Sequence, residues 1–170
     1  MKTIKQQAAF CRPDRAQYRI GEPVRILFSS SSGVPAVKSV RVFLLHREID
    51  CSWTQEDGVI VLAPLEPGNY GLSVVSEDGV FETAFDVVES AKSVIRYGFL
   101  SDFSPEDDDL ADVDWLCRLH VNTVQFYDWM YRHDRLISPE EEYLDPIGRS
   151  SSLRTIRQKI DACRSRGMRA

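Results

Sequence analysis

The stretch "SVIRYGFLSDF", residues 93–103, divides the sequence into two parts with different hydrophobic patterns. It is a nearly continuous apolar run, which is typical of a parallel strand covered on both faces. The polar residues that follow favour a helix start, because Ser104 can cap a helix and Pro105 fits its first position. The stretch therefore predicts a buried strand that leads directly into a helix.

The same alternation of strand and helix continues toward residue 170. Residues 121–130 are apolar enough for a second strand, and Gly167 stands where a glycine would end a second helix. The apolar stripes of the two predicted helices are Leu110, Val113, Leu116 and Cys117, then Leu153, Ile156, Ile160 and Cys163. Successive strand–helix units predict an α/β fold. Because a complete (β/α)8 barrel needs about 250 residues, we expect residues 91–170 to be the incomplete N-terminal part of such a barrel.

Upstream of the dividing stretch, apolar residues recur at every second position. Val24, Ile26 and Phe28 alternate after one turn signal, and similar short runs follow about every ten residues. This spacing predicts an antiparallel β-sandwich. The phrases "YRIGEPVRI" (18–26) and "LEPGNYGLSV" (65–74) resemble bacterial immunoglobulin-like modules. We therefore expect residues 1–90 to form an immunoglobulin-like β-sandwich domain.

Composition excludes several classes of protein. A formal charge of −5 argues against a general nucleic-acid binder, and no apolar run approaches the ~20 residues that span a bilayer. The widely spaced cysteines contain no CxxC pair, so we expect free thiols and no zinc site. The basic residues near the end predict a solvated helix face; they are Arg149, Arg154, Arg157, Lys159, Arg164, Arg166 and Arg169.

The first residues, "MKTIKQQAAF", contain no apolar stretch of signal-peptide length. This start predicts a cytoplasmic protein. The alternative is a secreted protein whose leader has been removed.

Three phrases of the second half carry a family resemblance. "RYGFLSDF" (96–103), "VQFYDWMYRHD" (124–134) and "DPIGR" (145–149) resemble the opening of the catalytic domain in glycoside hydrolase family 66. That family contains dextranases and cycloisomaltooligosaccharide glucanotransferases, which act on α-1,6-linked glucans. The resemblance also implies an immunoglobulin-like domain before a catalytic barrel.

The same resemblance implies a retaining mechanism with an Asp nucleophile and a Glu acid/base, a pair that sits ~5 Å apart. Both positions are expected beyond residue 170. No carboxylate of this chain inherits either role, so we expect an N-terminal fragment that is inactive by itself. No cofactor is expected.

The end of the second predicted strand combines aromatic rings with ionisable groups. Aromatic rings suit the apolar faces of sugars, and carboxylate or imidazole groups suit their hydroxyls. In βα barrels such strand ends form the active-site face. Asp102 ends the first predicted strand and is placed likewise. The predicted substrate-binding residues are Asp102, Tyr127, Asp128, Trp129, Tyr131, His133 and Asp134.

Simpler structural roles stay open for some of these residues. Trp129 can belong to the core, and Arg132 can form a structural ion pair with Asp134 or Asp128. A metal site at Asp128, His133 and Asp134 is disfavoured, because no further His or Cys lies near.

The function expected for the parent protein is a retaining glycoside hydrolase or transglycosylase acting on dextran or isomaltooligosaccharides. Hydrolysis and cyclisation both stay open, because water and an acceptor sugar compete for the same glycosyl-enzyme. The alternative is a non-catalytic carbohydrate-binding or accessory module. Neither function involves nucleic acid or a membrane.

Overall fold

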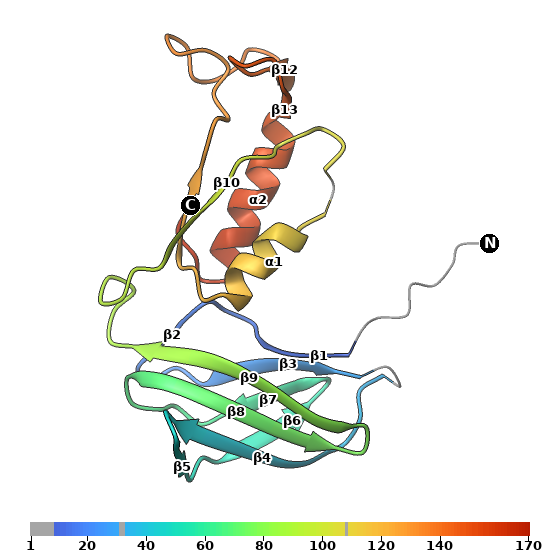
Figure 1. The fold of residues 1–170 in the computed structure, drawn as a ribbon, viewed down its shortest axis with the longest axis vertical. Coiled ribbons are helices and arrows are strands. Elements are labelled where there is room, and N and C mark those ends of the chain that lie inside the picture. Colours follow the sequence, from blue (N-terminus) through green and yellow to red (C-terminus); the bar gives the residue numbers. More distant parts are fainter. Residues whose placement is uncertain (1–8, 31–32, 108) are drawn as a thin grey trace, which may run out of the picture. The chain divides into compact units, whose positions relative to one another are not determined.

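The computed structural model describes residues 9–30, 33–107 and 109–170, and the chain divides into two compact units (Figure 1). One unit runs to Val94 and the other is Ile95–Ala170. Residues 1–8, on which the prediction about a leader rests, lie outside the described residues. No helix in the described ranges is long and apolar enough to cross a membrane.

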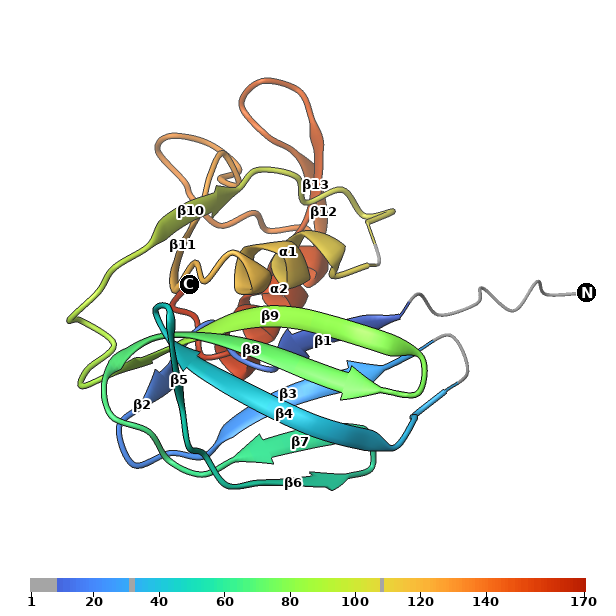
Figure 2. The same ribbon diagram turned by 60° about the horizontal axis from the view of Figure 1, so that its bottom comes forward.

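The first unit contains two sheets, which Figure 2 shows as two layers. The first sheet has the order β1-β3-β7-β6 and is antiparallel throughout. Its strands are β1 (Phe10–Pro13), β3 (Val24–Ser29), β6 (Trp53–Glu56) and β7 (Val59–Leu62). The second sheet has the order β2-β9-β8-β4-β5, with only its β2–β9 pair parallel. Its strands are β2 (Tyr18–Arg19), β4 (Val37–Leu44), β5 (Arg47–Ile49), β8 (Gly68–Ser76) and β9 (Gly79–Val88).

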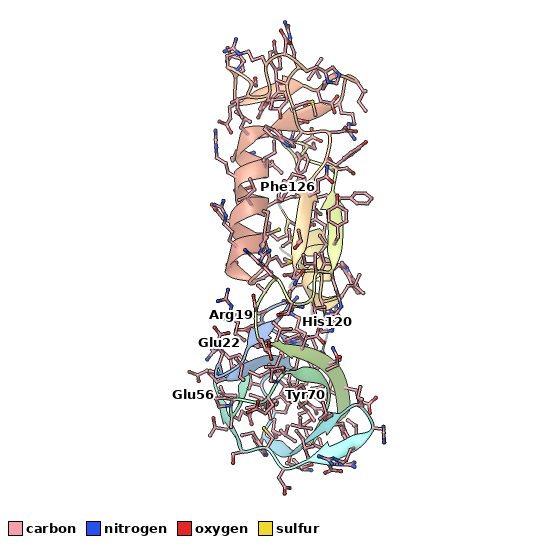
Figure 3. All side chains as sticks on the ribbon, turned by 90° about the vertical axis from the view of Figure 1, so that its left-hand side faces the viewer. Arg19, Glu22, Glu56, Tyr70, His120 and Phe126 are labelled. Atoms are coloured by element: carbon pink, nitrogen blue, oxygen red, sulfur yellow. The ribbon has the colours of Figure 1, made fainter. Side chains whose placement is uncertain are left out.

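Both sheets contribute side chains to one core. The alternation in β3 buries Val24, Ile26 and Phe28 and leaves Arg25 exposed, as a half-covered strand requires. The ring of Tyr70 stacks on Phe85 at 5.2 Å, and Figure 3 shows Tyr70 pointing into this core. The sheets are therefore sandwich-like. An immunoglobulin-like topology stays a prediction.

The described residues of the second unit form six short elements. They are β10 (Tyr97–Leu100), α1 (Ala111–Arg118), β11 (Thr123–Phe126), β12 (Glu142–Leu144), β13 (Ser150–Ser152) and α2 (Leu153–Ser165). The strands β10 and β11 form a two-stranded parallel sheet, and β12 and β13 form a separate antiparallel pair. The helices α1 and α2 lie side by side (Figure 1).

The prediction that residues 91–170 form the first βα units of a (β/α)8 barrel is wrong. The described strands of this unit fall into two separate pairs. Across the described ranges of the chain, regular structure is mostly sheet, with two short helices. After α2, Arg169 makes only an isolated bridge to Thr123. Between β11 and α2, residues 142–144 and 150–152 pair with each other as β12 and β13.

Two local predictions for this unit also need correction. The strand β10 is covered on one face only, because Tyr97 is 58% and Phe99 61% exposed. The first helix begins at Ala111, not near Ser104. Before it, the carbonyl of Ser104 accepts a hydrogen bond from the amide of Asp107, and the carboxylate of Asp107 bonds to Lys159. The residues at 104–107 therefore form a turn that precedes the helix.

The four cysteines are free thiols, and two of them, Cys117 and Cys163, are buried. Burial raises the pKa of the Cys11 thiol to about 12 and that of Cys163 to about 11. Such thiols stay protonated at neutral pH and are poor nucleophiles.

We expect the first unit to resist proteolysis better than the second. Its sheets enclose a core of their own, whereas the second unit exposes large apolar side chains such as Phe99 and Leu144 and contains a long irregular segment after β11. Brief digestion followed by mass spectrometry is expected to leave a protected fragment that ends between Val88 and Val94. Equal protection of both units would contradict this expectation.

Candidate functional site

The candidate site begins at the carboxyl ends of two neighbouring strands. Because β10 and β11 are parallel, their carboxyl ends lie at the same edge of the pair. Leu100 is in register with Phe126, and the amide of Tyr127 donates to the carbonyl of Leu100 at 2.7 Å. The predicted residues Asp102 and Asp128 each follow this register pair by two positions. The structure therefore brings the two strand ends that carry them together.

Asp128 has an unusual backbone conformation and an arginine partner. Its φ angle is +53°, in the left-handed region that aspartate tolerates better than most residues. The Nη2 group of Arg149 donates to the Asp128 carbonyl at 3.1 Å and lies 3.6 Å from Asp128 Oδ2. Arg149 thus pairs with Asp128, a residue for which a pair with Arg132 was one of two structural alternatives left open.

Arg149 is itself anchored by the buried carboxylate of Asp145. Its Nε donates to Asp145 Oδ2 at 2.7 Å. The amides of Ile147 and Arg149 donate to Asp145 Oδ1 at 3.0 and 2.8 Å, which closes a turn whose Gly148 has a φ of +86°. Burial alone would raise the pKa of Asp145, but the hydrogen bonds from these amides and from the guanidinium outweigh it and lower the pKa. Asp145 is therefore a charged anchor.

Asp102 belongs to the same electrostatic group. The pKa of Arg149 is raised chiefly by its hydrogen bond to Asp145, against the opposing effect of burial, and further by the negative charges of Asp145, Asp128 and Asp102. The Asp102 side chain accepts a hydrogen bond from the Ser104 amide at 3.2 Å. We call these four residues, Asp102, Asp128, Asp145 and Arg149, the Arg149 cluster.

A second network holds the backbone of Asp102. The carbonyl of Asp102 accepts a hydrogen bond from Lys159 Nζ at 3.1 Å, and the same ammonium group is paired with Asp107 and Asp112. Lys159 was expected on a solvated helix face, but it is only 1% exposed. Burial lowers the pKa of Lys159, and the hydrogen bonds to the two carboxylates more than offset this, so that the pKa is raised.

The predicted aromatic residues have different surroundings. Tyr127 is 50% exposed, and its ring lies 6.3 Å from that of Phe99. Trp129 lines an apolar cavity of about 500 Å³ together with aliphatic side chains of α2 such as Ile156 and Ile160. The carbonyl of Trp129 accepts a hydrogen bond from the Tyr143 hydroxyl. Trp129 thus has the surroundings of a core residue on at least one side, whereas Tyr127 is open to a ligand.

The remaining predicted residues lie in the turn after β11. The amide of Tyr131 donates to the carbonyl of Leu136 at 2.9 Å, and His133 and Asp134 are exposed within this turn. The Tyr131 ring packs edge-on against Tyr143 at 5.9 Å and carries the guanidinium of Arg132 at 4.7 Å. Tyr131 also lines a more polar cavity of about 470 Å³, whose other walls include Arg132, Ser138, Glu140, Glu142 and Tyr143.

Sequence reasoning missed Arg149 and Asp145. A recognisable signal was present, because Asp-Pro-x-Gly at 145–148 is a turn signature in which the aspartate accepts amides two or more residues ahead. Within the described ranges, no group of three or more His, Cys, Asp or Glu side chains is placed to hold a metal ion.

Comparison with known proteins gives consistent matches. The family model "Glycosyl hydrolase family 66" matches residues 13–170. One cycloisomaltooligosaccharide glucanotransferase from Niallia circulans is 39% identical over 89 residues, covering 47% of this chain and 9% of that protein. Another from the same organism is 26% identical over 181 residues, covering 88% of this chain and 18% of that protein. The chain thus spans less than a fifth of the length of these relatives.

A solved structure extends the match to the fold. The cycloisomaltooligosaccharide glucanotransferase from Paenibacillus sp., crystallised with cycloisomaltoheptaose, superposes with a TM-score of 0.74 at 25% identity. The match covers 95% of this chain and 27% of that structure. These findings confirm the family resemblance of the three phrases around β10, β11 and the "DPIGR" turn. With the family model matching nearly all of its residues, the chain belongs to glycosyl hydrolase family 66.

Proposed function

We propose that this chain supplies part of the glucan-binding surface of an enzyme that hydrolyses or transglycosylates α-1,6-linked glucans. The observation that carries the proposal is the Arg149 cluster, in which a partly exposed guanidinium is paired with the carboxylates of Asp128 and Asp145, at the edge of the strand pair where Asp102 also lies. Sugar hydroxyls both donate and accept hydrogen bonds, so a mixed cluster of this kind can bind them. Its place in a family 66 chain makes a glucan the best-supported ligand.

The proposed contacts follow from exposure and chemistry. Asp102 and Asp128 accept hydrogen bonds from sugar hydroxyls at the two strand ends. The exposed ring of Tyr127 packs against the apolar face of a sugar ring. The turn after β11 adds further contacts from Trp129, Tyr131, His133 and Asp134.

The proposed chemistry is that of a retaining enzyme. A carboxylate attacks the anomeric carbon, the leaving sugar takes a proton from a carboxylic acid, and water or a sugar hydroxyl then releases the glycosyl group. We assign neither carboxyl role to this chain. Its binding residues would orient the glucan, and the nature of the acceptor would decide between hydrolysis and cyclisation.

A second candidate function is carbohydrate binding without catalysis, as in an accessory module. The polar cavity beside Tyr131 and the exposed rings of Phe99 and Tyr127 favour it, because aromatic rings bind sugars without any catalytic group. The two functions differ in whether an enzyme that contains this chain cleaves glucan.

We expect the purified chain to bind isomaltoheptaose but not to cleave it. Calorimetric titration should give a dissociation constant on the order of 1 mM, since only part of a binding site is assigned to the chain. Maltoheptaose, which has α-1,4 links, is the control and should bind more weakly. Absence of binding to either sugar would contradict the proposed function. If protein free of host enzymes released reducing sugar, this would contradict the expectation that the nucleophile and the acid/base lie outside this chain.

A further inference from the structure

We propose that Arg149 is the positioning residue of the glucan site and that Asp145 is the anchor that fixes it. This inference rests on the proposed function and adds to it two residues that act through Asp128. One guanidinium makes both connections, with Nε 2.7 Å from Asp145 Oδ2 and Nη2 3.1 Å from the Asp128 carbonyl oxygen.

Neighbouring groups restrain the backbone at Asp128. Its φ of +53° lies in the left-handed region, which non-glycine residues adopt uncommonly, aspartate more often than most, and contacts from other segments stabilise it there. The chain segment 143–149 holds two consecutive carbonyls of this stretch. Arg149 donates to the carbonyl of Asp128, and the Tyr143 hydroxyl donates to the carbonyl of Trp129. These bonds fix the peptide groups on both sides of Trp129, the first of which also follows Asp128.

The position of Arg149 is set before any ligand arrives. The Asp145 side chain is fully buried. Its carboxylate accepts three hydrogen bonds, from the Ile147 amide, the Arg149 amide and Arg149 Nε. A planar guanidinium can present Nε to one oxygen and Nη2 to another at the same time, whereas the ammonium group of a lysine is a single point. The arrangement is therefore specific to arginine.

Charge gives a second reason for the arrangement. The guanidinium of Arg149 lies 3.6 Å from the Asp128 carboxylate as well as 2.7 Å from that of Asp145, so it neutralises part of the negative charge at this strand end. Its side chain is 41% exposed, which leaves it accessible beside the Asp128 carboxylate, itself 40% exposed. A neutral glucan would meet a pre-arranged pair of opposite charges at this point.

Two variants test the inference, with isomaltoheptaose as the ligand. We expect Arg149→Met to weaken binding about tenfold or more, as for loss of a charge-assisted contact. Arg149→Lys keeps the charge but should not restore wild-type affinity, because it lacks the planar fork. The matched control is Arg164→Met. The Arg164 side chain is 67% exposed, and its ion pair with Asp161 is long, at 3.9 Å. That control should leave affinity unchanged.

A double-mutant cycle separates positioning from general stability. If Arg149 acts through Asp128, Arg149→Met should cause little further loss of affinity in an Asp128→Gly background. Additive losses would overturn the inference, and so would wild-type affinity in Arg149→Lys or in folded Arg149→Met. If Arg149→Met does not fold, the Arg149→Lys comparison decides. Wild-type protein that binds no isomaltoheptaose would instead overturn the proposed function, and this inference with it.

Discussion

Replacing Lys159 with methionine is expected to lower the free energy of unfolding of the Ile95–Ala170 unit by about 3 kcal/mol, as when one partner of a buried ion pair is removed. Lys159 is 1% exposed, and its ammonium group binds the carboxylates of Asp107 and Asp112 and the carbonyl of Asp102. Methionine is similar in length to lysine, so the lost free energy of unfolding reflects the missing charge more than a missing side-chain volume. The carboxylates are 24% and 37% exposed, which places the effect toward the lower end for buried pairs.

The effect has a predictable dependence on pH. The pKa of Lys159 is raised in the folded chain, so its contribution is fully present below the unfolded value of about 10.4 and is lost as the pH rises through the folded value. Above about pH 10.4 the wild-type unit should therefore lose more stability than the Lys159→Met variant. The alkaline loss caused by Cys163 and Tyr143, whose pKa values are also raised in the folded chain, is common to both proteins.

Tryptophan fluorescence during urea unfolding can follow this unit selectively. Trp115 and Trp129 belong to it, and a Trp53→Phe background removes the signal of the other unit. Lys38→Met, at an exposed lysine of β4, is the control and should change little. Adding Asp107→Asn and Asp112→Asn to Lys159→Met should recover part of the stability, because no unpaired carboxylate is then left. A change of less than about 1 kcal/mol would show that the ion pairs are not important for the fold.

The second large effect is expected on ligand binding. Asp128→Gly should weaken binding of isomaltoheptaose by roughly ten- to a hundredfold, the equivalent of about 1.5–3 kcal/mol for a hydrogen bond to a charged group. Glycine is the appropriate replacement because the φ of +53° suits it, whereas alanine would add backbone strain. The melting temperature should change little, because the ion pair between Asp128 and Arg149 is long, at 3.6 Å, and both side chains are about 40% exposed.

Asp57→Gly provides a matched control for this variant. Asp57 is also an exposed aspartate with a positive φ, +46°, and it lies in the turn between β6 and β7. The substitution has the same backbone consequence without touching the candidate site. Affinity that falls equally in both variants, or a large fall in melting temperature for Asp128→Gly with affinity kept, would contradict a ligand-binding role for Asp128.

Local elements of the second unit could be predicted because their signals are local. The run at 93–103 contains β10, and the predicted helical stripes contain the buried residues Val113 and Cys117 of α1. Gly167 has a φ of +72° just after α2, as predicted for a glycine that ends a helix. Each of these features depends on residues within a few positions of each other.

The arrangement of strands could not be predicted in the same way. The number of strands in a sheet depends on pairing between distant segments, and a hydrophobic run records burial but not its partners. The pair β12–β13 was missed because "EYL" and "SSS" carry no alternating apolar pattern. Its turn was encoded instead in Asp145 and Gly148, which is a signal of turn chemistry and not of strand periodicity.

The site was predictable to the extent that it depends on strand ends. Asp102 and Asp128 were placed at neighbouring strand ends, and the parallel pair β10–β11 does bring those ends together. Arg149 was assigned to a basic helix face because only its charge and spacing were considered. Its hydrogen bonds to Asp145 and Asp128 arise from the turn geometry, which spacing does not describe.

The central claim is that a glucan binds at the Arg149 cluster and the turn after β11. The most direct test is a titration of ¹⁵N-labelled protein with isomaltoheptaose, followed through amide and arginine Nε–H chemical shifts. We predict saturable shifts at Asp102, at residues 127–134 and at the Arg149 side chain, with the sheets of the first unit unchanged. Shifts confined to the first unit, or no saturable shifts at all, would contradict the claim.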